Sequence, residues 1–346
     1  MFRWVRVSPL PKRDSESRGK NMNVVPKEFI RVMPDAMRDF ISEAFQKAGT
    51  SQEDAAHMAH LLVLTDLRGV FSHGTQQTPG YVGMMLDGKV NPRPNVQCID
   101  ESPTTAVYDG DGGMGHFASY HAAEAAVKKA KEMGLGAATS RNHFHFGSAG
   151  KYTRLALEVD CAGFAVSCHR FRHGPGGVIV TATGASPMSF AIPAGNQPPI
   201  VVDMATGIDA RLPLEQAFQQ SPAAYFKMLG LSHVSHALGG FMAGIWLFDK
   251  PPDPPTIWEG ANQGAFIAAI DISRFRPIDE YKAEIDQHIH DARQMQPAPG
   301  YDRSDLPGGL EWEREQEWAE IGIPIGEGHQ NSLKTVAERV GIPIPF

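Results

Sequence analysis

The stretch from residue 104 to residue 167 constrains the fold more than any other part of the chain, because it alternates short apolar runs with longer alanine-containing segments. Apolar runs of this length predict strands, and alanine-rich segments at helical spacing predict helices. In chain order, the expected strand, helix, strand, helix and strand are 104–108, 118–133, 135–140, 149–157 and 162–167. This alternation predicts an α/β architecture.

A glycine motif lies between the first strand and the first helix of this stretch. Residues 110–115 read GDGGMG and match the GxGxxG pattern of dinucleotide-binding folds. However, Asp109 and Asp111 would lie beside the pyrophosphate, where their charge opposes binding. The next strand also ends at Ser140 and Arg141, without an acidic residue for a ribose. We therefore interpret the motif as a tight turn with left-handed glycines.

The N-terminal part of the chain predicts helices. Apolar side chains recur at helical spacing between residues 34 and 66, and Gly49 divides this region into two helices. Ser51 is the expected N-cap of the second helix, with Asp54 three residues later in an arrangement close to a capping box. A third helix is expected at 79–86.

The chain beyond residue 167 changes character. Short apolar runs among glycine and proline predict strands for which antiparallel pairing is plausible. A Pro/Gly-rich loop at 306–309 separates the last two expected helices. The expected strands are 178–181, 188–192, 200–203 and 265–270, and the expected helices are 214–247, 281–295 and 330–340.

Together these elements predict a mixed α/β fold with a central mixed sheet. We expect residues 96–275 to form the central α/β domain. Residues 22–95 and 276–346 are expected to form a flanking helical domain from both chain ends, with the C-terminal helices packed on the N-terminal ones. Residues 1–21 are basic and have no apolar h-region, so they are interpreted as a disordered extension and not as a secretory signal.

Composition favours a small-molecule partner. The chain has 39 acidic and 32 basic residues and a net charge of −7, which gives no general attraction to nucleic acid. The longest apolar stretch, 237–248, falls short of the roughly 20 residues that a membrane span needs. Cys98, Cys161 and Cys168 have no CxxC spacing, so they suggest neither a disulfide framework nor a zinc site, and they fit a reducing cytoplasm.

Residues 66–74, DLRGVFSHG, end the second predicted helix and present Ser72 and His73 on a glycine turn. Histidine is the side chain best suited to move a proton near neutral pH. His145, followed closely by Gly147, also lies at the end of a predicted element, where function concentrates. We therefore expect His73 and His145 to be acid/base residues and Ser72 to hydrogen-bond a substrate oxygen. For each histidine taken alone, a structural role is the alternative.

Three histidine pairs offer a metal site as an alternative. The signature of two histidines four apart on a helix with an intervening glutamate is absent. Residues 174–177, GPGG, also make the segment from His169 to His173 a poor helix. We expect no metal site at the three pairs, which are His143 with His145, His169 with His173, and His233 with His236.

Four motifs taken together resemble the malate/L-lactate dehydrogenase family typified by L-sulfolactate and ureidoglycolate dehydrogenases. The match runs from about residue 22 to residue 207, resumes at LPGxxE in residues 306–311, and ends in a helix like that of the family. The motifs are DLRGVxSHG at 66–74, DGD at 109–111, RNxxHFGxAG at 141–150 and VDMAT at 202–206.

The resemblance implies a fold unrelated to the Rossmann domain. It further implies NAD(P)-dependent interconversion of a 2-oxo acid, or a related carbonyl or cyclic imine, with its 2-hydroxy or amino product. By position, His73 and His145 match the two acid/base histidines of the family. A homodimer whose active site lies near the subunit interface is also implied.

The resemblance assigns binding residues as well. Positions 202–204 match a segment that lines the cofactor, and residue 308 lies in the downstream motif. The expected cofactor contacts are Val202, Asp203, Met204, His233 and Gly308, and the expected substrate contacts are Arg68, Gln77 and Phe144.

Several positions depart from the family pattern. Gln77 replaces an arginine, so a bidentate carboxylate clamp is lost there. His233 replaces a lysine, Phe144 an asparagine and Gly309 a glutamate, and a stretch after Gly207 is missing. A second hypothesis therefore stays open: a lyase, isomerase or hydrolase that retains the two histidines and has lost nicotinamide binding.

Overall fold

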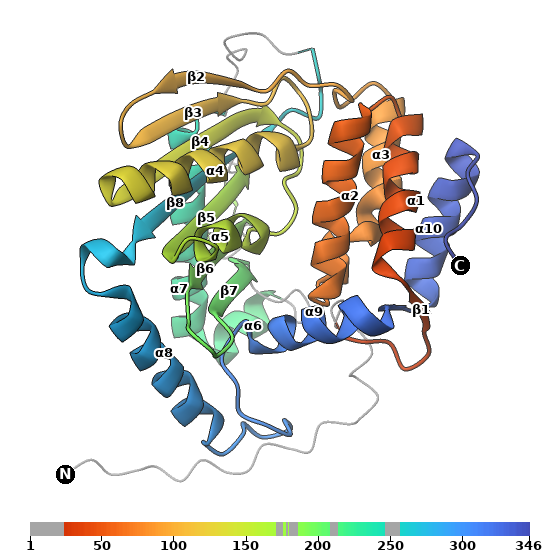
Figure 1. The fold of residues 1–346 in the computed structure, drawn as a ribbon. Coiled ribbons are helices and arrows are strands. Elements are labelled where there is room, and N and C mark those ends of the chain that lie inside the picture. The colour runs from red at the N-terminus through yellow and green to blue at the C-terminus, as the bar shows by residue number, and fades with distance from the viewer. Residues whose placement is uncertain (1–23, 171–175, 178, 180–185, 208–213, 246–256) are drawn as a thin grey trace, which may run out of the picture.

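A mixed sheet lies at the centre of the computed structural model, which describes residues 24–170, 176–177, 179, 186–207, 214–245 and 257–346 (Figure 1). Within these residues seven strands form the sheet, in the order β2-β3-β4-β8-β5-β6-β7. The β3 and β4 strands are parallel, and the other neighbouring strands are antiparallel. The strands are β2 Gln97–Glu101, β3 Thr105–Asp109, β4 Leu135–His143, β5 Cys161–His169, β6 Pro187–Ile192, β7 Ile200–Ala205 and β8 Gln263–Asp271.

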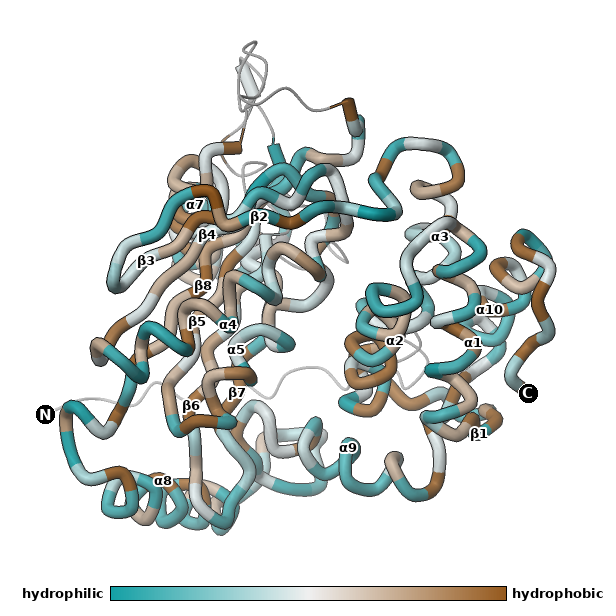
Figure 2. The backbone as a smooth tube through the Cα atoms, turned by 45° about the horizontal axis from the view of Figure 1, so that its top comes forward, coloured by the Kyte–Doolittle hydropathy of each residue, from teal (hydrophilic) through white to brown (hydrophobic). Residues whose placement is uncertain are grey.

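Helices α4 (Gly115–Met133) and α5 (Gly150–Leu157) lie over one face of this sheet (Figure 1). Small side chains on both surfaces allow close approach: a Cβ at Gly136 of β4 would lie 2.1 Å from the carbonyl oxygen of Ala126 in α4. Figure 2 shows apolar residues along the central strands beneath these helices. The alanine-rich pattern at 104–167 therefore builds a thin, tightly packed helix–sheet interface.

The other face of the sheet is contacted by α7 (Pro222–His236) and the π-helical segment η5 (Ala237–Met242). A short helix, α6 (Leu214–Gln220), precedes them. The expected helical region at 214–247 is thus divided before Pro222, because proline at the first position of a helix lacks an amide hydrogen and begins a new helix. Residues 246 and 247 lie outside the described part.

A helical bundle stands beside the sheet and is built from both chain ends (Figure 1). A two-stranded ladder of β1 (Ile30–Val32) and β9 (Ile323–Ile325) also joins the two ends. Fully buried side chains such as Phe45, Met58 and Leu333 form the apolar core of the helical bundle. The helices are α1 Pro34–Lys47, α2 Gln52–Leu67, α3 Thr78–Leu86, α9 Gly309–Ile321 and α10 Glu327–Val340.

Helix α8 (Ile278–Arg293) lies apart from this bundle (Figure 1). Its Asp286 carboxylate accepts hydrogen bonds from the backbone amides of residues 195–197, which follow β6. Of the predicted C-terminal helices, α10 packs on α1 and α3, whereas α8 is bonded through Asp286 to the loop after β6. The domain boundaries themselves stay a prediction.

The mixed α/β fold is confirmed, and so are most expected elements. Ser51 is the N-cap of α2 and accepts a hydrogen bond from the Asp54 amide, and β6 pairs antiparallel with β7. Helix α9 was not predicted, because its charged sequence gives little apolar periodicity. The expected strand at 178–181 and the extension at 1–21 cannot be compared: the extension and most of the strand lie outside the described part.

The described helices include none that is both long and apolar enough to cross a bilayer. The glycine motif at 110–115 forms a tight turn, in which the Gly113 amide donates to the Gly110 carbonyl. Asp111 and Gly112 have positive φ angles of 47° and 72°. The turn interpretation is therefore confirmed, although an aspartate holds one of the left-handed positions.

Candidate active site

The turn that carries His73 is held by the buried carboxylate of Asp66. This carboxylate accepts hydrogen bonds from the amide of Thr75, at 3.2 Å, and from its hydroxyl, at 2.5 Å. A side chain at Gly74 would overlap Asp66, because a Cβ there would lie 1.8 Å from Oδ1. The DLRGVFSHG sequence thus folds into two short 3-10 turns, Phe71–His73 and Thr75–Gln77, that project His73 from the end of α2.

The segment that carries His145 runs from β4 to α5 and crosses the start of α4. Gly115 permits this crossing, because a Cβ there would lie 2.6 Å from both the His143 ring and the Phe144 carbonyl oxygen. The His143 ring is hydrogen-bonded by the Ser140 hydroxyl at 3.0 Å and by the Phe144 carbonyl at 2.7 Å. His143 therefore has a structural role, while His145 turns toward the bundle.

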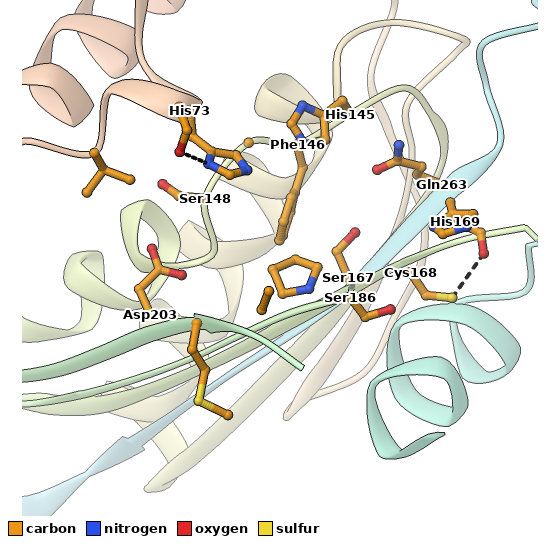
Figure 3. Close-up of a pocket in the computed structure, with 16 residues that line it drawn as sticks. His73, His145, Phe146, Ser148, Ser167, Cys168, His169, Ser186, Asp203 and Gln263 are labelled. Carbon is orange, nitrogen blue, oxygen red and sulfur yellow. Dashed lines mark hydrogen bonds between the residues drawn. The ribbon is translucent and has the colours of Figure 1, made fainter. Parts of the chain in front are cut away.

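His73 and His145 meet across the boundary between bundle and sheet, with ring centroids 5.7 Å apart. Both line a pocket of about 520 Å³ (Figure 3). The opposite wall comes from the ends of the sheet strands. The lining residues are Val70, Ser72, His73, His145, Phe146, Gly147, Ser148, Ser167, Cys168, His169, Ser186, Pro187, Asp203, Met204, Ala205 and Gln263.

Each of these two histidines has a hydroxyl partner. The Tyr81 hydroxyl lies 2.7 Å from His145 Nδ1, and the Ser72 hydroxyl lies 3.0 Å from His73 Nδ1. Burial raises the pKa of Tyr81, so its hydroxyl stays un-ionised and its oxygen can accept a hydrogen bond from a proton on Nδ1. With Tyr81 accepting, a neutral His145 carries its own proton on Nδ1 and leaves Nε2 free to accept one.

Both rings are neutral at pH 7. Burial lowers the pKa of His73 to about 4 and that of His145 to about 3, and the nearby ammonium of Lys151 adds to both shifts. A neutral imidazole with a free nitrogen is the form that accepts a proton. The pair is therefore in the protonation state of a general base.

The opposite wall is polar and acidic. The Asp203 carboxylate of β7 accepts a hydrogen bond from the Gly150 amide at 2.9 Å, and burial raises the pKa of Asp203. Met204 and Pro187 add apolar surface to the same wall. The buried Ser186 hydroxyl has no nitrogen or oxygen partner in the part of the chain that is described.

Lys151 and His116 were not expected from the sequence. Both are buried, and Lys151 Nζ lies 3.1 Å from His116 Nε2. Lys151 is in the first turn of α5, directly behind the pocket residue Gly147. A lysine on the same helix as the buried residues Tyr152 and Ala156 was the available signal, since a lysine among buried positions has a specific reason to be there.

The expected substrate contacts lie next to the pocket but not among its lining residues. Arg68 Nε lies 2.7 Å from a carboxylate oxygen of Glu315 in α9. The Gln77 amide donates to the Ser72 carbonyl at 2.7 Å, so it supports the histidine turn. Phe144 packs against Tyr81 edge to face. It therefore does not fill the pocket.

The expected cofactor contacts divide in the same way. Asp203 and Met204 line the pocket, whereas Val202 pairs with Phe190 in the sheet. Gly308, at φ +100°, lies against β7, where a Cβ would be 2.7 Å from the Val201 amide. His233 lies in α7 and bonds the Leu229 carbonyl through Nδ1. Neither Gly308 nor His233 lines the pocket.

Within the described residues, no group of three or more histidine, cysteine or acidic side chains is arranged to hold a metal ion. His143 is used in hydrogen bonds, and the rings of His233 and His236 lie on one helix, tilted to each other with centroids 5.5 Å apart. His173 lies outside the described part. The three cysteines are free thiols.

Comparisons with known proteins agree with this geometry. The family profile of malate/L-lactate dehydrogenases matches residues 32–223 and 213–334. The malate dehydrogenase of Pyrococcus horikoshii is 30% identical over 92% of this chain and 98% of its own. The L-sulfolactate dehydrogenase of Methanocaldococcus jannaschii is 29% identical over 90% and 97%. The ureidoglycolate dehydrogenase (NAD(+)) of Escherichia coli O157:H7 is 23% identical over 86% and 93%.

A solved structure gives the same result. The malate dehydrogenase of P. horikoshii OT3 superposes with a TM-score of 0.80, covering 93% of this chain and 98% of that one at 30% identity. The resemblance seen in the motifs thus extends over both the sheet and the bundle. The chain belongs to the malate/L-lactate dehydrogenase family.

Proposed function

We propose that the protein is an NAD(P)-dependent oxidoreductase that interconverts a small 2-hydroxy acid with its 2-oxo acid, or a related carbonyl or cyclic imine with its reduced product. Family membership supports the oxidoreductase class. The single observation that carries the proposal is the convergence of two half-buried, neutral histidines on one pocket. Oxidation of a hydroxyl group needs such a base to take the proton as hydride leaves carbon.

The strand wall has features that fit a nicotinamide. Met204 and Pro187 offer apolar surface for a flat ring, and the Ser186 hydroxyl, which has a cysteine thiol as its partner and no nitrogen or oxygen partner in the described part, can turn to a carboxamide. Asp203 and Met204 are the residues that would hold the group. When bound, a nicotinamide accepts hydride from the substrate carbon or returns it.

The chain's own residues handle the proton. Tyr81 holds Nδ1 of His145, which leaves Nε2 as the nitrogen that exchanges a proton with the substrate oxygen. His73, held by the Ser72 hydroxyl, orients the substrate from the bundle side. Because both rings are neutral at pH 7, the oxidation direction needs no prior proton loss. Reduction requires that one ring be protonated first.

The test is direct binding. Purified protein is titrated with NADH and with NADPH while the nucleotide fluorescence is followed. Candidate 2-hydroxy acids are then screened together with the oxidised form of the nucleotide that binds. Saturable binding of one nucleotide and hydride transfer to it are expected. If neither nucleotide binds at millimolar concentration, the proposal is wrong.

We propose a homodimer as the working form, as the family resemblance implies. Exposed apolar side chains on α7 and η5, among them Phe226, Phe241 and Met242, support an interface there. Free thiols at all three cysteines support a reducing, cytoplasmic compartment. Light scattering after gel filtration tests the dimer, and a mass near 37.7 kDa would contradict it.

A further inference from the structure

Lys151 is a buried cation directly behind the pocket wall. Lys151 is only 4% exposed, and its Nζ would lie 2.6 Å from a Cβ placed on Gly147. Gly147 lines the pocket. Because Gly147 has no side chain, only its backbone separates the ammonium from that part of the wall.

No carboxylate in the described part of the chain is ion-paired with Lys151. Its hydrogen-bond partner is the neutral ring of His116, whose pKa burial lowers well below its usual range. Asp203 and Asp66 attract Lys151 from a distance, but the amides of Gly150 and Thr75 already bond their carboxylates. The positive charge is thus only partly compensated.

The other cations around the pocket are engaged: Arg154 donates to the Gly150 carbonyl and attracts Asp203. No lysine or arginine is among its lining residues in the described part. The neighbouring Arg68 is paired with Glu315, and the Gln77 amide is bonded to the Ser72 carbonyl. A carboxylate that enters this pocket beside Asp203 therefore needs a compensating charge.

We propose that Lys151, held by His116, compensates the negative charge of the substrate through the thin wall at Gly147, so that the pocket selects anionic over neutral carbonyl compounds. Lys151 acts here as a positioning residue: its field draws the carboxylate to the Gly147 side and leaves the carbonyl near the histidines. This inference rests on the proposed function for its substrate class.

The pH dependence of anion binding follows from the surroundings of Lys151. Burial lowers the pKa of Lys151 to about 7, opposed by the Asp203 and Asp66 carboxylates and assisted by Arg68. Burial also lowers the pKa values of the other groups that face it, His116, His73 and His145, so these rings are neutral near pH 7 and above. The cationic form is lost as pH rises through 7, so anion affinity should fall between pH 6 and pH 8.

The experiment uses two isosteric probes, the anion oxamate and the neutral oxamide, titrated calorimetrically into the full-length protein with and without saturating NADH. Wild type should prefer oxamate. In K151M the oxamate affinity should fall by roughly tenfold or more, the change expected for a unit charge lost at protein-like dielectric. Oxamide affinity should stay unchanged, and K151R should recover part of the preference.

A matched control is K129M. Lys129 in α4 is similarly buried, at 6% exposure, but donates to Glu101 and the Ser102 carbonyl far along the sheet. The K129M variant should therefore keep the wild-type preference for oxamate over oxamide. Thermal unfolding of each variant monitors folding, and H116Q gives a second test should K151M unfold: it should weaken oxamate binding more than oxamide binding.

Three outcomes overturn the inference: wild type does not prefer oxamate, K151M keeps the preference, or K151M loses both probes equally. Absence of NADH binding with a normal Lys151-dependent preference for oxamate would instead contradict the proposed oxidoreductase function alone. The two proposals therefore fail separately.

Discussion

The two walls of the pocket differ in how their polar groups are satisfied. On the histidine wall, the His73 and His145 rings each have a hydroxyl partner within 3.0 Å and are neutral. On the strand wall, Asp203 is open to the pocket and lies near a partly compensated ammonium, and the Ser186 hydroxyl has no nitrogen or oxygen partner in the described part. The histidine wall is complete without a ligand, whereas the strand wall leaves bonding capacity for one.

Replacing His145 should give the largest effect and should break the histidine wall alone. We expect H145Q to lower kcat by about 10²- to 10⁴-fold, the usual contribution of general acid–base catalysis. Nucleotide affinity, which belongs to the strand wall, should stay within about twofold. Steady-state kinetics and nucleotide titration measure the two quantities.

The matched control is H143Q. His143 is two residues away and more deeply buried, but its ring is hydrogen-bonded within the protein and lies outside the pocket lining. H143Q should lower the unfolding temperature and leave kcat of the folded enzyme nearly unchanged. Equal losses of kcat in both variants would contradict the assignment of His145.

Acid should act on the two walls in opposite directions. The folded-state pKa values of His73, His143 and His145 lie below the unfolded value of 6.5, so the unfolded chain binds more protons as pH falls below 6.5 and stability is lost. Lys151, with a pKa lowered from 10.5 to about 7, is protonated in both states well below pH 7, so it adds to the loss only around pH 7 and above. Asp203, with a raised pKa, takes up its proton in the fold before it does so in the unfolded chain and opposes the loss.

We expect the histidines to dominate because more of them are buried. The free energy of unfolding should fall by about 3 kcal/mol between pH 7.5 and pH 5.5, at about 1.4 kcal/mol per unit of displaced pKa for each group. Urea titrations at the two pH values measure the change. In H143Q the fall should be smaller by about 1 kcal/mol. An unchanged pH dependence in that variant would argue against a neutral buried His143.

The backbone behind the histidine wall should tolerate no added side chain. In G115A the new methyl group would meet the Phe144 carbonyl oxygen at 2.6 Å and the Phe146 Cβ at 2.7 Å. We expect a loss of about 2–4 kcal/mol in the free energy of unfolding, because backbone must move to relieve the overlap. Chemical denaturation measures it.

The control is G80A in helix α3. Gly80 has open space around its Cβ position, so alanine should be neutral or stabilising by up to about 1 kcal/mol. If G115A were as well tolerated as G80A, the close crossing of the His145 segment over α4 would be wrong.

Much of this fold was predictable because its signals are local. Apolar periodicity, the Ser51 cap and the antiparallel strands after residue 186 all appear in the structure. The end of the strand β4 and the start of the helix α5 were also predictable, and they place His145 in the segment between the two elements. By contrast, α9 was missed because a charged helix that packs through few apolar side chains leaves little periodic signal.

The candidate site was predictable only in part. The turn sequence presents His73, but its partners come from afar in the chain: Tyr81 bonds His145 over 64 residues, and Gly150 bonds Asp203 over 53. Lys151 shows the limit most clearly: its place among apolar positions of α5 is a sign of burial, but nothing in the sequence indicates His116 as its partner. Burial of a charge is decided by tertiary packing, which spacing along the chain does not encode.

The smallest effect expected on the histidine wall is that of its hydroxyl support. Y81F removes the acceptor for the His145 Nδ1 proton, so the neutral ring no longer has a fixed tautomer and Nε2 is free to accept a proton less often. We expect kcat to fall by roughly tenfold, less than in H145Q, because the base itself remains. The nucleotide KM should not change.

Y152F separates this effect from simple loss of a buried hydroxyl. Tyr152 is as buried as Tyr81, but its hydroxyl donates to the Phe146 carbonyl and not to a histidine. Y152F should therefore cost stability, by about 1–2 kcal/mol, while kcat stays near that of wild type. If both phenylalanine variants lowered kcat equally, the hydroxyl of Tyr81 would act through packing, and the tautomer argument for His145 would fail.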